Sequence, residues 1–318
     1  MADKYYKQIL VLSGKGGTGK TSISAALSET IPADIVIDAD VDAANLNLVL
    51  NNHIKSKHQF FGGKKAQIDS DLCSKCGLCE DICRFDAITN FYISQISCEG
   101  CGFCFHICPN NAINFTDSQS GVFYNSQIET GNDLYFARLF AGEGNSGKLV
   151  TKLKKSALEN LTEAFNKKND NSLNPIKWIV IDGPPGIGCP VNASLSGVDY
   201  VVMVTEPTKS GLHDLKRLIE LLKTFKTKSG LIINKYDLNS EVSQEIKTLA
   251  LNNSIELLSL LPFDRDFVKA AQNAKSIIEY KKSLGLESAH NNATSNNYIN
   301  YETEFKSIFS KINFSITS

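Results

Sequence analysis

The sequence predicts an α/β fold in which a mostly parallel sheet is flanked by helices and carries a small inserted α+β domain. Near the start, the apolar run Ile9 to Leu12 leads into a glycine-rich loop and then into a helical pattern through Ser28. Later apolar runs each end in polar residues, which is typical of parallel strands in such sheets. Eight of the nine cysteines fall between residues 73 and 108. These observations predict a nucleotide-binding type of sheet with a separate cysteine-rich insert.

The length, composition and charge of the chain fit this organisation. Its 318 residues allow one large domain plus a small insert, and 42% apolar residues can fill the core. The 33 basic and 34 acidic residues give a net charge of −1, so no nucleic-acid surface is expected. No apolar run is long enough to span a bilayer, so we expect no stable membrane insertion and a cytoplasmic location. The predicted domains are residues 1–65 plus 118–285 for the large domain, 66–117 for the insert, and 286–318 for a linker and an amphipathic helix.

The glycine-rich loop after the first apolar run has the spacing of a phosphate-binding P-loop. Gly14 is followed, after four residues, by Gly19-Lys20-Thr21, between a predicted strand and a predicted helix. In such loops the backbone amides surround the phosphates, the lysine reaches the β and γ oxygens, and the hydroxyl binds magnesium. Lys20 is therefore a predicted catalytic residue and Thr21 a predicted magnesium ligand. The predicted nucleotide-binding residues of this loop are Gly14, Lys15, Gly16, Gly17, Thr18, Gly19, Lys20 and Thr21.

A second lysine, Lys15, indicates which class of P-loop this is. The segment K-G-G-T-G-K-T, residues 15–21, resembles the deviant Walker A motif of the MinD, ParA and nitrogenase iron protein class. The resemblance implies an ATPase that works as a dimer, with itself or with a related ATPase, in which the signature lysine crosses to the partner's nucleotide. Lys15 would then be catalytic, because it stabilises charge on the transferring phosphate as an arginine finger does. The alternative is a solvated loop lysine.

The second apolar run, Ile35 to Ile37, ends in the acidic segment Asp38 to Asp42. The carboxyl ends of parallel strands are where α/β sheets build their sites. The segment resembles the second acidic motif of the same ATPase class, which makes Asp40 the candidate catalytic residue that orients the attacking water. Asp38 is predicted to lie near the magnesium shell. The alternative is that these carboxylates cap the amino end of a helix, and one carboxylate can do both.

A third run, Trp178 to Ile181, leads to Asp182 and then to Gly-Pro-Pro-Gly. This segment resembles a Walker B aspartate followed by a switch loop that senses the γ-phosphate. Asp182 is therefore a predicted magnesium ligand, directly or through water. The Gly and Pro residues leave the loop few conformations, which suits a switch with two positions.

Two more apolar runs, Val201 to Val204 and Leu231 to Ile233, predict further strands. The second run ends in Asn234-Lys235-x-Asp237, a pattern that also reads guanine in GTPases. The resemblance to the MinD class implies instead that Asn234 contacts adenine, and we expect ATP as the nucleotide. GTP is the alternative.

The cysteine block consists of two copies of C-x-x-C-x-x-C-x-x-x-C. A [4Fe-4S] cluster needs four soft thiolate ligands, and three cysteines at two-residue spacing supply three of them from one loop. In two-cluster arrangements the fourth cysteine of each run serves the other cluster. The alternatives are zinc, which rarely uses such triples, and disulfides, which need an oxidising compartment. The predicted ligands are Cys73, Cys76, Cys79 and Cys108 for one cluster and Cys83, Cys98, Cys101 and Cys104 for the other.

The block resembles bacterial two-cluster ferredoxins over residues 66–117. Each run is followed by Ala-Ile, at Ala87 and at Ala112, which indicates an internal repeat. Pro109 follows the second run, as in that family, but Arg84 takes the equivalent place in the first run, which affects the local turn more than iron binding. Acidic residues outnumber basic ones in the segment, which favours an unidentified redox partner with a basic surface.

Three remaining features have more than one explanation. Residues 142–149 mimic a P-loop, but Leu149 stands where a hydroxyl is required, so we expect this segment to cap the following helix or to face the nucleotide or the partner subunit. Residues 286–299 indicate a flexible tether. The apolar face of the final helix is expected to pack on the core rather than to act as a membrane hook. Cys189, outside the block, is expected to be a small buried residue.

Three functions are compatible with these motifs. The first is ATP-gated electron transfer through two [4Fe-4S] clusters to an unidentified partner, the second an Mrp-like iron-sulfur cluster carrier, and the third a MinD- or ParA-like positioning switch. A cluster that bridges a two-fold dimer needs two ligands per subunit, and outside the block only Cys189 is available. We therefore expect electron transfer, with ATP hydrolysis as the enzymatic activity and with ATP, Mg²⁺ and two [4Fe-4S] clusters as cofactors.

Overall fold

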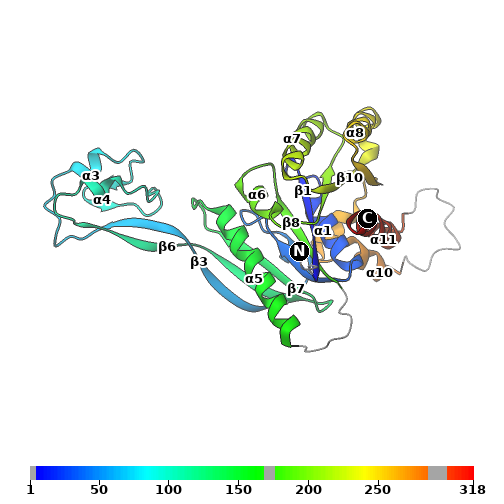
Figure 1. Cartoon of the computed structure of the whole chain (residues 1–318), viewed down its shortest axis with the longest axis horizontal. Helices are drawn as coiled ribbons and strands as arrows, with labels where there is room; N and C mark the ends of the chain where they lie inside the picture. Colours follow the sequence, from blue (N-terminus) through cyan, green and yellow to red (C-terminus); the bar gives the residue numbers. More distant parts are fainter. Residues whose placement is uncertain (1–4, 168–175, 286–298) are drawn as a thin grey trace.

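The computed structural model describes residues 5–167, 176–285 and 299–318, and their centre is a nine-stranded sheet (Figure 1). The strand order is β11-β10-β9-β1-β8-β2-β7-β6-β3. The seven strands from β11 to β7 are parallel, whereas β6 and β3 run antiparallel to their neighbours. The predicted α/β fold with a mostly parallel sheet is confirmed. The strands are β1 (Tyr6–Ser13), β2 (Ala33–Asp38), β3 (Asn52–Ile68), β6 (Ile113–Ile128), β7 (Asp133–Leu139), β8 (Lys177–Pro185), β9 (Tyr200–Thr205), β10 (Lys228–Asn234) and β11 (Glu256–Leu261).

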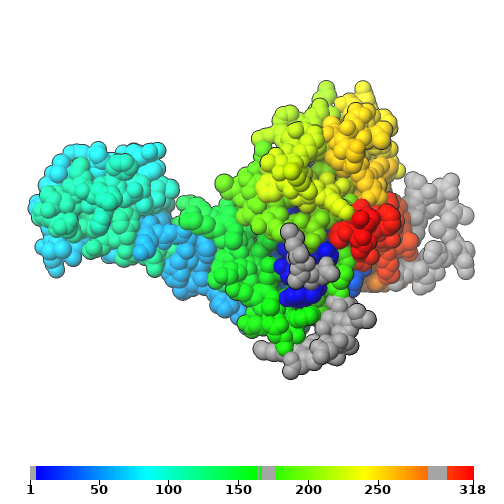
Figure 2. All heavy atoms as spheres, in the orientation of Figure 1, coloured from blue at the N-terminus to red at the C-terminus, as the bar shows by residue number. Residues whose placement is uncertain are grey.

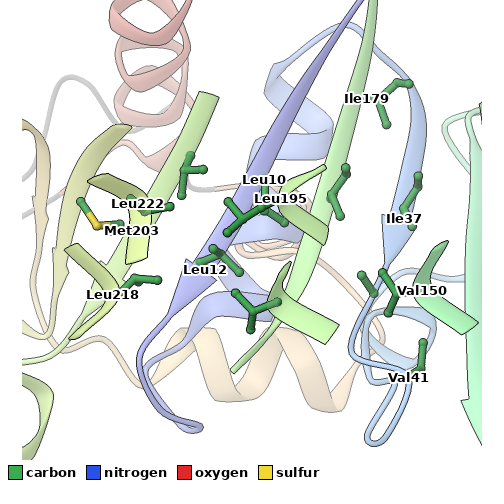
Figure 3. Packing of buried hydrophobic residues seen from close by; sticks show 14 of the residues in the cluster. Leu10, Leu12, Ile37, Val41, Val150, Ile179, Leu195, Met203, Leu218 and Leu222 are labelled. Carbon is green, nitrogen blue, oxygen red and sulfur yellow. The ribbon is translucent and has the colours of Figure 1, made fainter. Parts of the chain in front are cut away.

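Helices cover both faces of the parallel part of the sheet, which explains why its strands are continuous apolar runs. In β1, Leu10 and Leu12 belong to the core on one face, and Ile9 and Val11 to the core on the other. Figure 3 shows the first of these cores between neighbouring strands. The helices that pack on the first core are α5 (Ser146–Lys167), α6 (Cys189–Leu195), α7 (Lys209–Phe225) and α8 (Ser240–Asn252), and those on the second are α1 (Lys20–Thr30), α10 (Ile277–Ser283) and α11 (Tyr301–Thr317). Shorter helices are α2 (Leu46–Val49), α9 (Asp266–Gln272) and the 3₁₀ turn η1 (Tyr236–Leu238).

The final helix, α11, packs on the core, as predicted. Phe305, Ile308 and Ile312 are fully buried in it, and the ring of Phe309 lies edge-on against Trp178 at 5.0 Å. The helix lies beside α1 in the layer on that face of the sheet. In the described part of the chain, no helix combines the length and the apolar character that crossing a membrane requires. The predicted tether, apart from its last residue, lies outside the described residues.

Strands β3 and β6 form a long two-stranded ribbon that leaves the sheet at its edge (Figures 1 and 2). Their pairing runs from Asn52 with Ile128 to Ile68 with Ile113. The far end carries residues 69–112, which we call the cysteine module. The rest of the described chain, except the ribbon, we call the body. The predicted limits of the insert, residues 66 and 117, fall inside the two ribbon strands.

The cysteine module is small and contains little regular structure. It holds the two-stranded hairpin of β4 (Ile88–Thr89) and β5 (Tyr92–Ile93), and the single-turn helices α3 (Leu78–Asp81) and α4 (Phe103–Ile107). The two helices lie against each other. Its buried cluster includes three of its cysteines together with Ala87, Ile88 and Ile93. The module is therefore built around its cysteine loops rather than around a sheet.

Candidate functional site

The P-loop joins β1 to α1 at the carboxyl edge of the sheet. Gly17 and Gly19 have φ angles of 81° and 89°, a region that residues with a Cβ atom rarely adopt. A Cβ atom on Gly14 would lie 2.5 Å from the Cβ atom of Asp214, so glycine is required there as well. The loop thus leads directly to the amino end of α1, where backbone N–H groups without helical partners can bind phosphate.

Asp182, near the end of β8, is bound by three side chains of α1. Lys20 Nζ lies 2.8 Å from Asp182 Oδ1, and Ser24 Oγ donates a hydrogen bond of 2.8 Å to the same oxygen. Thr21 Oγ1 donates to Oδ2, also at 2.8 Å. Lys20 and Asp182 are only 6% and 1% exposed. Water therefore cannot solvate either charge if its partner is removed. The structure brings together Lys20, Thr21 and Asp182, which the sequence assigned to one site.

Asp38 lies beside Asp182, because β2 and β8 pair in that register. Its carboxylate accepts backbone N–H bonds from Asp40 at 3.1 Å, from Asn45 at 3.0 Å and from Leu46 at 2.9 Å. Burial, and then the nearby Asp182 carboxylate, raises the pKa of Asp38 to about 7. Since Asn45 and Leu46 stand at the start of α2, Asp38 also fills the capping role that was its alternative assignment.

Asp40 is partly exposed on the loop that follows β2. Burial raises the pKa of its carboxyl, and the Lys20 cation opposes that rise. A carboxylate with a raised pKa at the phosphate site is suited to orient a water molecule and to take up its proton. The geometry therefore places Asp40 and Lys20 at one edge of the sheet, and the water-orienting role stays a prediction.

Lys15 points to its own subunit rather than away from it. Its Nζ lies 2.8 Å from Glu206 Oε1 and 3.0 Å from Ser210 Oγ. Glu206 Oε2 also binds Lys235 at 3.0 Å, and Lys235 donates to the carbonyl oxygen of Gly17. Burial alone would raise the pKa of Glu206, but the bonds from Lys15 and Lys235 outweigh it and lower that pKa. The signature lysine is thus held by a carboxylate in the single subunit.

Asn234, at the end of β10, supports the P-loop and lines a cavity beside it. Its Nδ2 donates to the carbonyl oxygen of Thr18 at 2.8 Å, and a Cβ atom on Gly19 would collide with the same amide. The cavity measures about 320 Å³ and includes Phe263 and Phe267 in its wall. Flat apolar side chains next to a phosphate loop suit a purine base.

Asp237, which would read guanine in the GTPase pattern, has another partner. Its Oδ1 accepts a backbone N–H bond of 2.7 Å from Phe263. Among the described residues that line the cavity, Phe263 is present and Asp237 is absent. The carboxylate therefore fixes the cavity wall instead of facing the base, which favours adenine over guanine.

Two cavities open in the cysteine module, and each is lined by the four cysteines of one predicted cluster. The remaining walls are mostly apolar, with Ile68 and Ile113 in one cavity and Ile88 and Ile93 in the other. Four soft ligands converge on each cavity from several directions, so the residues present fit a thiolate-bound cluster. Cys73, Cys76, Cys79 and Cys108 line the first cavity, and Cys83, Cys98, Cys101 and Cys104 line the second.

The two cysteine runs repeat one backbone geometry. The amide of Ala87 donates to Cys83 Sγ and the amide of Ala112 donates to Cys108 Sγ, both at 3.3 Å. The glycines that precede α3 and α4 both have left-handed φ angles, of 83° and 87°. Backbone N–H bonds to sulfur stabilise thiolate ligands. The repeat expected from the sequence is therefore present in the backbone, although Arg84 replaces proline in the first run.

Cys189 is exposed at the start of α6, so the prediction that it is buried is wrong. It follows the switch loop directly, where the chain turns out of the sheet. Within residues 5–167, 176–285 and 299–318, no group of three or more His, Cys, Asp or Glu side chains is arranged to hold a single metal ion.

Comparison with known proteins identifies the family of the nucleotide-binding part. A family model described as the CobQ/CobB/MinD/ParA nucleotide binding domain matches residues 9–277. The chain belongs to this family.

Relatives of this MinD/ParA-type chain include several archaeal proteins. An uncharacterised protein of Methanocaldococcus jannaschii is 35% identical over 269 residues, covering 84% of this chain and 88% of the relative. An uncharacterised ATP-binding protein of the same organism is 24% identical over 268 residues, covering 83% and 76%. Among solved structures, the MinC:MinD cell division protein complex of Aquifex aeolicus matches with a TM-score of 0.52 at 15% identity, over 96% of both chains. The chain thus shares its fold with MinD.

Sequence reasoning missed three residues of this MinD/ParA-type site. Ser24 and Lys20 share Asp182, and Lys15 and Lys235 share Glu206. The polar segment after the strand at 201–204 was a signal for Glu206, because it follows a buried parallel strand. Its partner, however, lies 191 residues earlier in the chain, and only the pairing of β1 with β9 brings the two loops together.

Proposed function

We propose that this MinD/ParA-type protein hydrolyses ATP at its P-loop and that the nucleotide controls electron transfer through two [4Fe-4S] clusters in the cysteine module. The observation that carries the proposal is the pair of cavities in the cysteine module, each lined by four cysteines. The family membership supports the ATPase part. The two clusters and their coupling to ATP go beyond what the family membership supports.

In the proposed ATPase reaction, water attacks the γ-phosphorus, and the bond from that phosphorus to its bridging oxygen breaks to give ADP and phosphate. Lys20 stabilises the charge on the phosphate oxygens, and Asp40 orients the water. Thr21, Asp182 and the neighbouring Asp38 would hold Mg²⁺, which would supply positive charge against the phosphate oxygens. Before nucleotide binds, Lys20 and Thr21 are bonded to Asp182, so phosphate binding exchanges these bonds for bonds to the ligand.

In the complete ATPase site we propose that Lys15 reaches the nucleotide of a partner subunit, which is either a second copy or a related ATPase. In the single subunit Lys15 is held by Glu206. Dimer formation therefore requires this ion pair to break, and hydrolysis depends on the protein concentration. The arrangement delays catalysis until a partner is present.

In the cysteine module the chain supplies cysteine thiols and backbone N–H donors. Burial raises the pKa of Cys79 and of Cys104, so these thiols keep their protons unless a metal replaces them. Each cluster, when bound, would accept and release one electron at a time. The acidic surface predicted for this segment favours a partner with basic residues at its docking surface.

Cluster delivery and positioning are the competing functions. Each cavity draws all four cysteines from one subunit, so a cluster held there is fully ligated without a partner. A fully ligated cluster is retained rather than donated, which favours electron transfer. Cys189 is exposed beside the switch loop, but it supplies only one thiol per subunit.

Anaerobic potentiometry followed by electron paramagnetic resonance tests the proposal. The purified protein is titrated with and without Mg²⁺ and a non-hydrolysable ATP analogue, and Lys20→Met is titrated in parallel as a variant with an impaired phosphate site. We expect about eight irons per chain and a nucleotide-dependent change in the signals or potentials of the normal protein only. Zinc or no metal in the purified protein overturns the cluster assignment. The coupling is overturned if the clusters show the same potentials, the same signals and the same electron-transfer rate to a redox dye with and without the nucleotide.

A further inference from the structure

Residues 140–148 connect β7 to the first turn of α5 and contain most of the P-loop mimic at 142–149. They lie between the cysteine module and the switch loop. They bind no nucleotide in the proposed mechanism. Helix α5 begins at Ser146, so the last residues of the segment form its first turn. Figure 1 shows the amino end of α5 next to the ribbon. We call residues 140–148 the joint.

On the module side, the joint is tied to the ribbon and to a cysteine loop by one buried lysine. Glu143 Oε1 lies 2.5 Å from Nζ of Lys65, which is 8% exposed. The same Nζ donates to the carbonyl oxygen of Gln95, and Gln95 Nε2 donates to the carbonyl oxygen of Ala66 at 3.0 Å. Gln95 stands three residues before Cys98. Lys65 therefore fixes the base of the loop that supplies three cysteines to the second cavity.

The joint makes three further contacts with this part of the molecule. Lys148 Nζ donates to the carbonyl oxygen of Gly62 in the ribbon at 3.3 Å, and Phe140 N donates to Ser120 O at 2.9 Å. A Cβ atom on Gly142 would contact Ile96 of the module at 3.8 Å. A movement of the joint therefore displaces the ribbon and the module together.

On the side of the nucleotide site, the joint packs against Cys189, the first residue of α6 after the switch loop. A Cβ atom on Gly147 would lie 3.3 Å from the carbonyl oxygen of Cys189, so the backbones of α5 and α6 are in close contact there. Farther along α5, Lys154 Nζ donates to Ser194 O at 2.6 Å and to Ser196 O at 2.7 Å. These bonds hold the carboxyl end of α6 on α5, and the two helices form one packed unit.

We propose that the joint transmits the nucleotide state of the switch loop to the Cys98–Cys104 loop, with Lys65 and Glu143 as positioning residues. When the loop after Asp182 changes position, α6 moves with it because Cys189 continues that loop directly. Because packed interiors have low compressibility, the displacement of α6 is transmitted to α5. Glu143 then moves Lys65 and Gln95. The proposal rests on the nucleotide-binding part of the proposed function and does not depend on electron transfer.

Hydrogen exchange measured by mass spectrometry on the full chain tests this transmission without any redox readout. Exchange is recorded with and without Mg²⁺ and a non-hydrolysable ATP analogue, and protection of the P-loop peptide reports nucleotide binding in the same sample. In the normal protein we expect at least about a twofold change in the exchange rate of residues 93–104. Glu143→Gln keeps the size of the side chain and removes its charge, and it should abolish that change while the P-loop remains protected.

A matched control lies on the same ribbon strand. Lys55 forms an ion pair of 2.6 Å with Asp133, but this pair is exposed and lies away from the joint. Lys55→Met should keep the nucleotide-dependent change, and Lys65→Met should lose it. No change in the normal protein, or a change that persists in both Glu143→Gln and Lys65→Met, contradicts the proposal. Iron content, measured separately, shows whether the cluster assignment has failed instead.

Discussion

The body and the cysteine module obtain their stability in different ways. The body buries two large apolar cores, one on each face of its sheet. The module has one small cluster, in which three of the eight buried residues are cysteines, and its side chains Tyr92, Ile96 and Phe103 are more than half exposed. Small folds with little core depend on metals or disulfides. The body should therefore fold by burial alone, whereas the module should need its ligands.

The two regions also prepare their sites differently. In the body, Lys20, Thr21 and Ser24 are already bonded to Asp182, so the side chains are ordered before nucleotide binds. In the module, backbone turns and N–H donors orient the cysteines. Loss of one side chain should consequently affect one region and spare the other.

The largest effect is expected from Phe305→Ala in the core of the body. This side chain is fully buried in α11, and its removal should lower the free energy of unfolding by about 3–5 kcal/mol. Urea unfolding followed by the fluorescence of Trp178, the single tryptophan, reports on the body. Phe314→Ala on the same helix, where the ring is 74% exposed, should cost less than about 0.5 kcal/mol. Equal losses in both variants would show that α11 does not stabilise the body.

Lys20→Met should reduce ATP hydrolysis by about 100- to 1,000-fold, the loss typical of removing one stabilising charge or donor at a reaction centre. Iron content should stay unchanged, because the module lies at the far end of the ribbon. Steady-state phosphate release and iron analysis on the same preparation measure both. Hydrolysis within threefold of normal would place the phosphate site elsewhere.

Cys79→Ser and Cys104→Ser should each remove one cluster, or about half of the iron. The loss should make residues 69–112 sensitive to protease while the Trp178 signal of the body remains normal. Cys189→Ser, a change of the cysteine outside the module, should leave the iron content unchanged. If either module variant kept all its iron, or if the body unfolded with the module, the contrast between the two regions would fail.

Glu206→Gln should have the smallest effect. It weakens the hold on Lys15, and an ion pair of this exposure contributes about 0.2–1 kcal/mol, so basal hydrolysis at low protein concentration should rise by less than about fivefold. Glu220→Gln, which removes an exposed partner of Lys223, is the control and should leave the rate unchanged. A lower rate in Glu206→Gln would mean that Glu206 supports catalysis rather than restraining Lys15.

The sequence predicted the parallel strands of the body well, because strands buried on both faces consist of continuous apolar residues. The runs at 9–12, 35–37, 178–181, 201–204 and 231–233 all lie inside observed strands. Of the strands in the main sheet, it did not predict β3, β6, β7 and β11. Strand β3 is largely exposed and rich in lysine and histidine, so it has no apolar run by which it could be recognised.

Most residues of the candidate site could be predicted from local sequence motifs. The P-loop, Asp38, Asp182 and Asn234 come together as their positions at strand ends indicated. Contacts between distant segments could not be predicted from the sequence. The ion pair of Lys65 with Glu143 is an example, because neither residue belongs to a motif that indicates its partner. The exposure of Cys189 was also missed, because a lone cysteine carries no pattern from which its burial can be inferred.

The register of the ribbon has a consequence for protein engineering. Ile68 and Ile113, which flank the cysteine module, are paired neighbours on β3 and β6, so the chain enters and leaves the module at the same place. A two-residue turn such as Asn-Gly can connect such strands directly. The module is therefore a cassette that can be excised, or exchanged for another domain with adjacent ends, without altering the order of strands in the body.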